Sequence, residues 1–372
     1  MPRARVADDV SSAPFLEADR RRGRGARTNR AGRYEAETHE AFDDGWESLR
    51  DLEGFKTTVQ DEQVKSIIAR NDSPDLSFDR SINPYRGCEH GCIYCYARPT
   101  HAYLGHSPGL DFETKLYAKK NAAERLRDEL AKPGYQAASL ALGAVTDPYQ
   151  PIEKRYEITR ELLEVLEDTG HPVGIVTKSH LVTRDIDILS RMAAKGLAKV
   201  AVSITTLDRR IARRMEPRAA TPERRLDAVR ALTEAGIPTS VMVAPVVPGL
   251  TDNEIEQILS AASKAGARSA GYVLLRLPLE LKELFREWLV TDFPDRANRV
   301  INLLQDMHGG ADYRSDFGVR QRGSGPFAQL ISQRFRKALE RNGMTGARLE
   351  LRTDLFRKPA RRTEGGTQLN LL

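Results

Sequence analysis

The chain has 372 residues, of which 40% are hydrophobic and 30% charged, and its formal net charge is +6. No apolar run approaches the roughly 18 residues of a membrane span, and the first residues lack the apolar stretch of a signal peptide, so we expect no membrane association and a cytoplasmic protein. Only three cysteines are present, and this odd number does not suit a disulfide-built secreted domain.

Residues 1–55 form the first predicted segment, a basic and largely disordered tail. Residues 20–33 read Arg-Arg-Arg-Gly-Arg-Gly-Ala-Arg-Thr-Asn-Arg-Ala-Gly-Arg. Scattered charge with little apolar periodicity favours disorder. Arginine runs neutralise phosphates and release counterions, which fits binding to nucleic acid, but a solvated tail in an arginine-rich proteome has the same composition.

Residues 56–292 form the predicted core domain, in which short β-branched runs alternate with amphipathic helical stretches. The predicted strands are Phe78–Asn83, Ser139–Val145, Pro172–Thr177, Ala198–Ile204, Pro238–Val243 and Ala270–Arg276. The predicted helices are Glu153–Asp168, Arg184–Ala194, Pro222–Ala235, Asn253–Ala265 and Glu280–Leu289. Four glycines stand where such helices end: Gly170, Gly196, Gly236 and Gly266. Six βα units cannot close an eight-stranded barrel, so the pattern predicts an α/β fold with an open partial (βα)6 TIM-like barrel.

Residues 293–362 are predicted to be a basic helical extension that covers the open side of the barrel. Val300–Met307 and Phe327–Asn342 have helical periodicity, and Tyr313–Gly325 between them has the composition of a loop. The loop contains three arginines that either line a phosphate track or are simply solvated: Arg314, Arg320 and Arg322. Residues 363–372 are predicted to form a flexible tail.

The three cysteines stand together as Cys88-Glu-His-Gly-Cys92-Ile-Tyr-Cys95, a C-x3-C-x2-C motif. A [4Fe–4S] cluster has four irons, so three thiolates leave one iron open to a small molecule. The alternative is a structural Cys3His zinc site with a nearby histidine as fourth ligand, from the set His90, His101 and His106. Zinc modules usually carry two separated C-x2-C halves, whereas this chain has one half with a wider first gap.

This motif, with the aromatic Tyr94 just before its last cysteine, resembles the signature of the radical S-adenosylmethionine (SAM) superfamily. Three segments resemble the spore photoproduct lyase branch, also called DNA repair photolyase-like: Ser81-Ile-Asn-Pro-Tyr-Arg-Gly-Cys88, Tyr94-Cys95-Tyr96-Ala97-Arg98 and Thr146-Asp147-Pro148-Tyr149-Gln150-Pro151. The resemblance covers residues 78–289. It implies a [4Fe–4S] cluster on Cys88, Cys92 and Cys95, with SAM bound at the open iron. One electron from a flavodoxin or ferredoxin then cleaves SAM to methionine and a 5′-deoxyadenosyl radical, which abstracts hydrogen from a substrate.

Polar residues at the carboxyl ends of the predicted strands are the candidates for binding SAM, because these ends meet on one face of a βα architecture. The resemblance implies that Lys178 pairs with the methionine carboxylate and that Ser203 bonds the carboxylate or the ribose. It also implies that Tyr94 packs near the adenine, mainly through its backbone. Thr146 ends the second strand and joins this set. Each of them has an alternative as an ordinary strand-end or core residue.

The substrate is predicted less closely than the cofactor, with DNA favoured and RNA or a protein side chain as alternatives. A non-catalytic, zinc-bearing nucleic-acid-binding protein is the alternative from a different class. The resembled spore photoproduct lyases use a further cysteine as hydrogen donor, and this chain has none. Literal repair of the spore photoproduct therefore requires another relay, for which Tyr272 and Tyr149 are the candidates.

The last residues, Gln368-Leu369-Asn370-Leu371-Leu372, follow a glycine-rich linker. They resemble the Q-L-x-L-F/L peptides by which bacterial repair and replication proteins dock onto the DNA sliding clamp. The motif is short and also arises by chance. Clamp binding is therefore a hypothesis, and deletion of 368–372 should abolish clamp pull-down if it holds.

Overall fold

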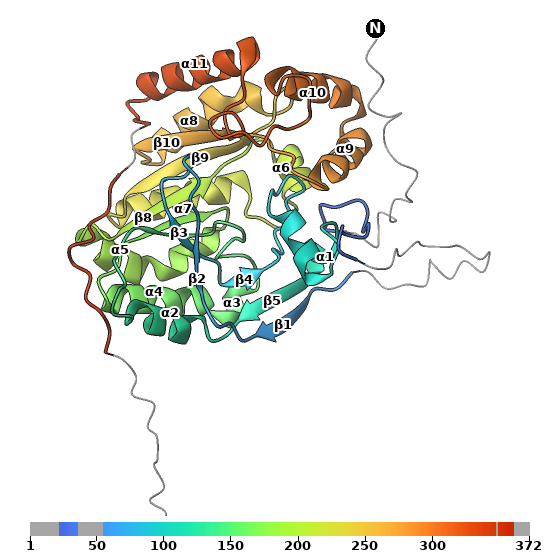
Figure 1. The fold of residues 1–372 in the computed structure, drawn as a ribbon. Helices are drawn as coiled ribbons and strands as arrows, with labels where there is room; N and C mark the ends of the chain where they lie inside the picture. The colour runs from blue at the N-terminus through green and yellow to red at the C-terminus, as the bar shows by residue number, and fades with distance from the viewer. Residues whose placement is uncertain (1–21, 36–54, 347–348, 361–372) are drawn as a thin grey trace, which may run out of the picture.

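The computed structural model describes residues 22–35, 55–346 and 349–360, and its centre is a seven-stranded sheet (Figure 1). The strand order is β10-β9-β8-β7-β6-β3-β2, and only β2 runs antiparallel to its neighbour. The strands are β2 (Ile68–Arg70), β3 (Arg80–Ile82), β6 (Leu140–Leu142), β7 (Val173–Thr177), β8 (Ala198–Ser203), β9 (Thr239–Val246) and β10 (Ser269–Leu274). The six parallel strands are the six that the sequence predicts. Because β2 and β10 remain as separate edges, the open partial barrel is confirmed.

Helices follow the strands and cover the outside of this sheet (Figure 1). They are α2 (Ala122–Leu130), α3 (Glu153–Tyr156), α4 (Ile158–Asp168), α5 (Ile186–Ala194), α6 (Arg209–Met215), α7 (Pro222–Glu234), α8 (Ile255–Lys264) and α9 (Leu281–Asp292). The four predicted C-cap glycines all have positive φ, from 62° at Gly170 to 103° at Gly266. Successive side chains of β9 point to opposite faces of the sheet. Val241 and Val243 on one face are buried, whereas Ser240 and Met242 on the other face are partly exposed.

One predicted helix, Glu153–Asp168, is two helices in the structure. The chain turns at Glu157, which has φ 53°, between α3 and α4. The buried carboxylate of Glu153 accepts hydrogen bonds from the Tyr85 hydroxyl and, at 3.1 Å, from the Thr159 amide. Apolar periodicity continues through the turn, so the pattern alone does not reveal the break.

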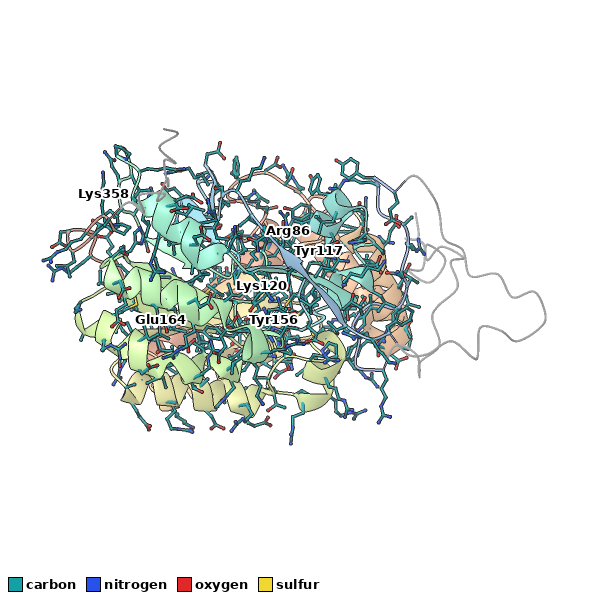
Figure 2. The ribbon with its side chains drawn as sticks, turned by 90° about the horizontal axis from the view of Figure 1, so that it is seen from below. Arg86, Tyr117, Lys120, Tyr156, Glu164 and Lys358 are labelled. Carbon is teal, nitrogen blue, oxygen red and sulfur yellow. The ribbon has the colours of Figure 1, made fainter. Side chains whose placement is uncertain are left out.

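A smaller sheet, which the sequence did not predict, lies beside the barrel and has the order β1-β5-β4. Its strands are β1 (Thr58–Glu62), β4 (Tyr85–Arg86) and β5 (Lys115–Lys119). Charged residues dominate its exposed side, where Arg86 pairs with Glu62 at 2.8 Å and Lys120 with Asp61 at 2.8 Å. Figure 2 shows Arg86, Tyr117 and Lys120 on this side of the molecule. These strands lack the β-branched runs that mark the main sheet.

Residues 22–35, which we call the N-terminal strap, are packed against the core. Arg24, Ala26, Arg27 and Thr28 are buried. Three arginines of the strap pair with acidic residues at or just before α9: Arg27 with Asp292, Arg30 with Glu287 at 2.5 Å and Arg33 with Glu280 at 2.7 Å. The prediction of a disordered tail is therefore wrong for the strap. These arginines are neutralised within the molecule, so they do not form a free phosphate-binding run.

The C-terminal extension contains α10 (Pro294–Met307) and α11 (Gly325–Arg341), as predicted, with a loop between them. Two of the three loop arginines pair with carboxylates: Arg320 with Asp75 at 2.6 Å and Arg314 with Asp316 at 2.7 Å. A phosphate track made of all three is therefore not supported. The clamp-like peptide Gln368–Leu372 lies outside the described residues. Within those residues, no helix has the length and apolar character needed to cross a bilayer.

Two buried histidines predict how stability depends on pH. Burial lowers the pKa of His101 and of His171 from 6.5 to about 4. The folded state thus disfavours a proton that the unfolded chain binds, so stability is retained above about pH 6.5 and lost as the pH falls toward 4. Between pH 7.5 and pH 5, we expect urea unfolding of the metal-free protein to lose roughly 2 kcal/mol per histidine. His171→Gln should flatten this dependence, and an unchanged slope in that variant would contradict the assignment.

Candidate active site

The cysteine loop, residues 87–95, follows β4 and opens into a large cavity inside the partial barrel. Cys88, Cys92, Tyr94 and Cys95 all line this cavity, whose volume is about 1880 Å³. The Cys88 amide donates to the Phe112 carbonyl at 3.0 Å, and the Cys95 amide donates to the Cys92 carbonyl at 3.2 Å. These backbone bonds turn the loop so that thiols separated in sequence share one wall of one cavity.

The three thiols do not form a ready-made site for a single metal ion among the described residues. Among the described residues, no group of three or more His, Cys, Asp or Glu side chains could hold one metal ion. In a cluster each thiolate binds a different iron, so its ligands stand further apart than those of a zinc ion. Burial raises the pKa of Cys92 to about 12 and raises that of Cys88 as well. A bound metal would supply positive charge that favours the thiolate forms of Cys88 and Cys92. Metal analysis of the purified protein distinguishes a cluster from the zinc alternative.

A buried ion pair between Arg98 and Glu113 holds the backbone of the cysteine loop in place. The guanidinium of Arg98 donates to the Cys92 carbonyl at 2.9 Å, to the Gly91 carbonyl at 3.1 Å and to Glu113 at 2.5 Å. Glu113 in turn accepts from the Gly25 and Ala26 amides of the N-terminal strap, each at 2.9 Å. Because Arg98 and Glu113 are fully buried, their charges compensate each other and fix the loop to the strap.

The strap and the loop touch so closely that one position tolerates only glycine. A Cβ built on Gly25 would lie 1.9 Å from the Gly91 carbonyl oxygen. We expect Gly25→Ala to lower the free energy of unfolding by about 2–3 kcal/mol, as overpacked sites do, and to reduce iron retention. The matched control is Gly134→Ala, where a Cβ meets nothing within 4 Å. Equal urea midpoints for the two variants would contradict this close packing.

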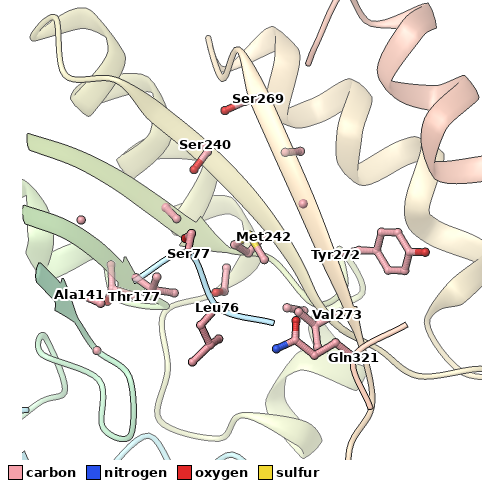
Figure 3. Close-up of a pocket in the computed structure, with 18 of the residues that line it drawn as sticks. Leu76, Ser77, Ala141, Thr177, Ser240, Met242, Ser269, Tyr272, Val273 and Gln321 are labelled. Atoms are coloured by element: carbon pink, nitrogen blue, oxygen red, sulfur yellow. The ribbon is translucent and has the colours of Figure 1, made fainter. Parts of the chain in front are cut away.

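The predicted SAM-binding residues gather around the same cavity. Tyr94, Thr146, Lys178 and Ser203 all line it. The Lys178 ammonium lies 5.7 Å from the centre of the Tyr94 ring, and no carboxylate among the described residues pairs with it. The Thr146 hydroxyl donates to the Gly87 carbonyl at 2.7 Å, which ties it to the cysteine loop. Figure 3 shows the part of the cavity formed by β9 and β10, with Ser240, Met242 and Val273 along it.

Two residues to which the sequence analysis gave no role connect the strand ends to the cysteine loop. Asp147 accepts from the Lys178 amide at 2.8 Å and from the Thr177 hydroxyl at 2.7 Å, and His90 lies 3.4 Å away. Burial alone raises the pKa of Asp147, but His90 and these donors outweigh it and lower the pKa to about 2. Gln150 accepts from the Glu89 amide at 2.8 Å. Asp147 therefore stays ionised and holds the end of β7 near the loop.

Sequence reasoning missed a buried network behind Tyr94. The hydroxyls of Tyr94 and Thr205 donate to the Glu216 carboxylate, which also pairs with Arg225. Arg225 donates to the Ser203 carbonyl at 3.1 Å. Burial opposes the charge on Glu216, but Arg225 and Lys178 lower its pKa, so it is a carboxylate at neutral pH. Glu216 and Arg225 stand far from the cysteines in sequence, and no motif marks them.

The two tyrosines named as relay candidates are engaged by other side chains. Tyr149 is fully buried, does not line the cavity, and donates to Asp185 at 3.1 Å. Tyr272 borders the cavity, but its ring packs on Phe335 with centroids 4.7 Å apart, and Figure 3 shows it directed away from Met242. The geometry favours neither as a hydrogen donor.

Comparison with known sequences agrees with the geometry of this site. Residues 82–262 match the model of the Radical SAM superfamily. An uncharacterised protein of Mycobacterium tuberculosis is 39% identical over 230 residues, which are 61% of this chain and 68% of that protein. The Radical SAM Nalpha-GlyT isomerase of Pseudomonas phage M6 is 27% identical over 238 residues, or 61% of this chain and 46% of that protein.

Among solved structures, spore photoproduct lyase complexed with dinucleoside spore photoproduct is similar in fold. The TM-score is 0.54 at 16% identity, and the match covers 77% of this chain and 80% of that protein. Enzymes of the superfamily use a [4Fe–4S] cluster and SAM. With the cysteine loop at the mouth of a partial barrel and these matches together, the chain belongs to the radical SAM superfamily.

Proposed function

We propose that this chain is a radical SAM enzyme that binds a [4Fe–4S] cluster through Cys88, Cys92 and Cys95 and acts on nucleic acid, with DNA as the favoured substrate. The observation that carries the proposal is that all three cysteines and the strand-end residues Lys178 and Ser203 line one cavity of about 1880 Å³. When bound, the cluster supplies reductive cleavage of SAM to a 5′-deoxyadenosyl radical. The enzyme would work in the reducing cytoplasm with a flavodoxin or ferredoxin as electron donor.

The protein's own residues would orient SAM and exclude solvent. The half-buried ammonium of Lys178, which has no carboxylate partner among the described residues, suits the methionine carboxylate. Ser203 is buried at the end of the next strand, and Arg225 holds its backbone. The hydroxyl of Tyr94 is occupied by Glu216, so the ring is fixed and the Tyr94 backbone can face the adenine.

Nucleic acid is favoured as substrate because cations and an exposed aromatic ring line the cavity. Arg276 lies 4.3 Å from the centre of the Tyr96 ring, which is 45% exposed, and Arg322 also lines the cavity. Rings offer stacking surfaces to bases, and guanidinium groups offer contacts to phosphates. The similar structures include spore photoproduct lyase complexed with dinucleoside spore photoproduct, which is in keeping with a substrate of this class.

The experiment that tests the proposal is anaerobic reconstitution with iron and sulfide, followed by dithionite reduction with SAM and assay of 5′-deoxyadenosine. We expect cleavage that depends on cluster, reductant and SAM together. Competition binding of damaged duplex DNA against tRNA then tests the substrate class. Bound zinc without cleavage would refute the enzyme assignment, whereas cleavage with tRNA binding tighter than DNA binding would refute the favoured substrate.

A further inference from the structure

A second recess lies beside the cysteine loop and is lined almost entirely by arginine. Its volume is about 470 Å³, and its lining comprises Arg22, Gly23, Arg24, Arg27, Arg213, Arg214 and Pro217. We call it the arginine pocket. It lies where the N-terminal strap meets α6, and none of the described residues in its lining is acidic.

Few of these charges are neutralised by carboxylates. Arg27 and Arg214 share one acidic partner, Asp292. Arg24 donates to neutral oxygens: the Glu113 carbonyl at 3.1 Å, the Phe55 carbonyl at 2.9 Å and the Thr57 hydroxyl at 2.9 Å. Arg22 and Arg213 are exposed, and neither forms an ion pair with any residue that the structure describes. The pocket thus keeps a strong positive field.

The electrostatic environment of Arg24 agrees with this field. Burial and the neighbouring Arg218 lower the pKa of Arg24, and the nearby carboxylates of Glu113 and Glu89 offset this only in part. An anion that enters the pocket would therefore stabilise the charged form of Arg24 electrostatically. The pocket is therefore suited to a partner that presents several carboxylates.

The walls of the pocket touch the part of the loop between Cys88 and Cys92. Gly25, next to Arg24, packs against the Gly91 carbonyl, and a Cβ on Gly91 would lie 3.4 Å from Pro217. The Arg218 amide donates to the His90 carbonyl at 3.2 Å. Gly91 does not line the large cavity, although Cys88 and Cys92 on either side of it do. One layer of residues thus separates the arginine pocket from the loop that carries the thiols.

The position of the arginine pocket behind the cysteine loop distinguishes between two anionic partners, a nucleic-acid substrate and an acidic electron-donor protein. A nucleic-acid substrate must reach the large cavity, where the strand ends lie. An electron donor must instead come close to the cysteine loop without blocking that cavity. Electrostatic complementarity speeds such encounters between a basic and an acidic protein.

We propose that the arginine pocket, in which Arg22 and Arg213 are exposed, is the docking surface for an acidic one-electron donor protein of the flavodoxin or ferredoxin class. The inference rests on the proposed function. One electron leaves the reduced donor and enters the cysteine-bound cluster, so the donor is oxidised and the cluster reduced by one electron. No covalent bond forms or breaks in this transfer.

The test compares two doubly charge-reversed variants with the wild type. Arg22→Glu with Arg213→Glu changes the pocket, and Lys337→Glu with Arg341→Glu places the same change in charge on the exposed face of α11. The first measurement is the affinity of each protein for a reduced flavodoxin at low and at high salt. The second is 5′-deoxyadenosine formation driven by that flavodoxin or by dithionite.

We expect the pocket variant to bind flavodoxin about tenfold more weakly at low salt, with a smaller difference at high salt. Its flavodoxin-driven rate should fall while its dithionite-driven rate matches the wild type, and the α11 variant should show neither change. Unchanged flavodoxin affinity in the pocket variant would overturn the inference. So would a loss of duplex DNA affinity with flavodoxin binding intact, which would make the pocket a nucleic-acid surface. If wild-type protein does not cleave SAM even with dithionite, the proposed function fails, and the binding measurement still decides the docking surface.

Discussion

Cys92→Ala is expected to reduce 5′-deoxyadenosine formation by at least about 100-fold, because the loss of a direct metal ligand should exceed the 10–100-fold cost of removing a residue that only supports one. Cys92 lines the cavity together with the other two cysteines, and in the proposed cluster each thiolate would bind one iron. Cys88→Ala and Cys95→Ala should have the same effect. The measurement is iron and sulfide per chain, together with SAM cleavage under dithionite.

The control for the cysteine variants is Ile93→Val, a change in the same loop at a fully buried position. It removes one methylene, which should cost about 0.5–1.5 kcal/mol of stability and leave iron content unchanged. If Cys92→Ala retained both iron and cleavage, the cluster would have to be placed elsewhere in the chain.

Glu216→Ala should lower the free energy of unfolding by about 3–5 kcal/mol, since it leaves Arg225 as a buried charge without its carboxylate. Arg225 is 1% exposed, and the Tyr94 and Thr205 hydroxyls lose their acceptor at the same time. Because Arg225 also holds the Ser203 carbonyl, the variant should require more SAM for half-maximal cleavage. Urea unfolding and the SAM concentration dependence measure the two effects.

A surface ion pair supplies the matched control for Glu216. Glu256 pairs with Arg334 at 2.7 Å, but its side chain is 38% exposed, so Glu256→Ala should cost no more than about 1 kcal/mol. Glu216→Gln keeps an acceptor for Tyr94 and removes only the charge. Its loss of unfolding free energy should therefore lie between those of Glu216→Ala and Glu256→Ala. Equal costs for Glu216→Ala and Glu256→Ala would show that the Tyr94 network is not a buried ionic centre.

The main sheet could be predicted from the sequence because its strands bury one face completely and the other in part, and are therefore rich in Val, Ile and Ala. The strand β8, for example, reads Ala-Lys-Val-Ala-Val-Ser. The small sheet could not, because β1 reads Thr-Val-Gln-Asp-Glu and is mostly exposed. The order of β7, β8, β9 and β10 followed from the alternation of strands and helices alone.

The candidate site could be predicted where residues are close in sequence or end a strand. The cysteines were found by their spacing, and Lys178 and Ser203 by their place at the ends of β7 and β8. The Glu216–Arg225 pair and the Arg98–Glu113 pair depend on contacts that folding creates, and local patterns do not show which charges will be buried together. For the same reason the strap had the composition of a solvated tail, although its acidic partners lie near α9.

The pairing of the strap with α9 also sets an order of events during synthesis. Arg27 emerges from the ribosome early, whereas its partner Asp292 follows 265 residues later. The contact between the strap and α9 therefore cannot form until most of the chain exists, and such long-range closure comes late. The bonds from Gly25 and Ala26 to Glu113 span 88 and 87 residues, so they need only the first third of the chain. We therefore expect the cover that Gly25 gives to Gly91 to form before the strap is completed on α9.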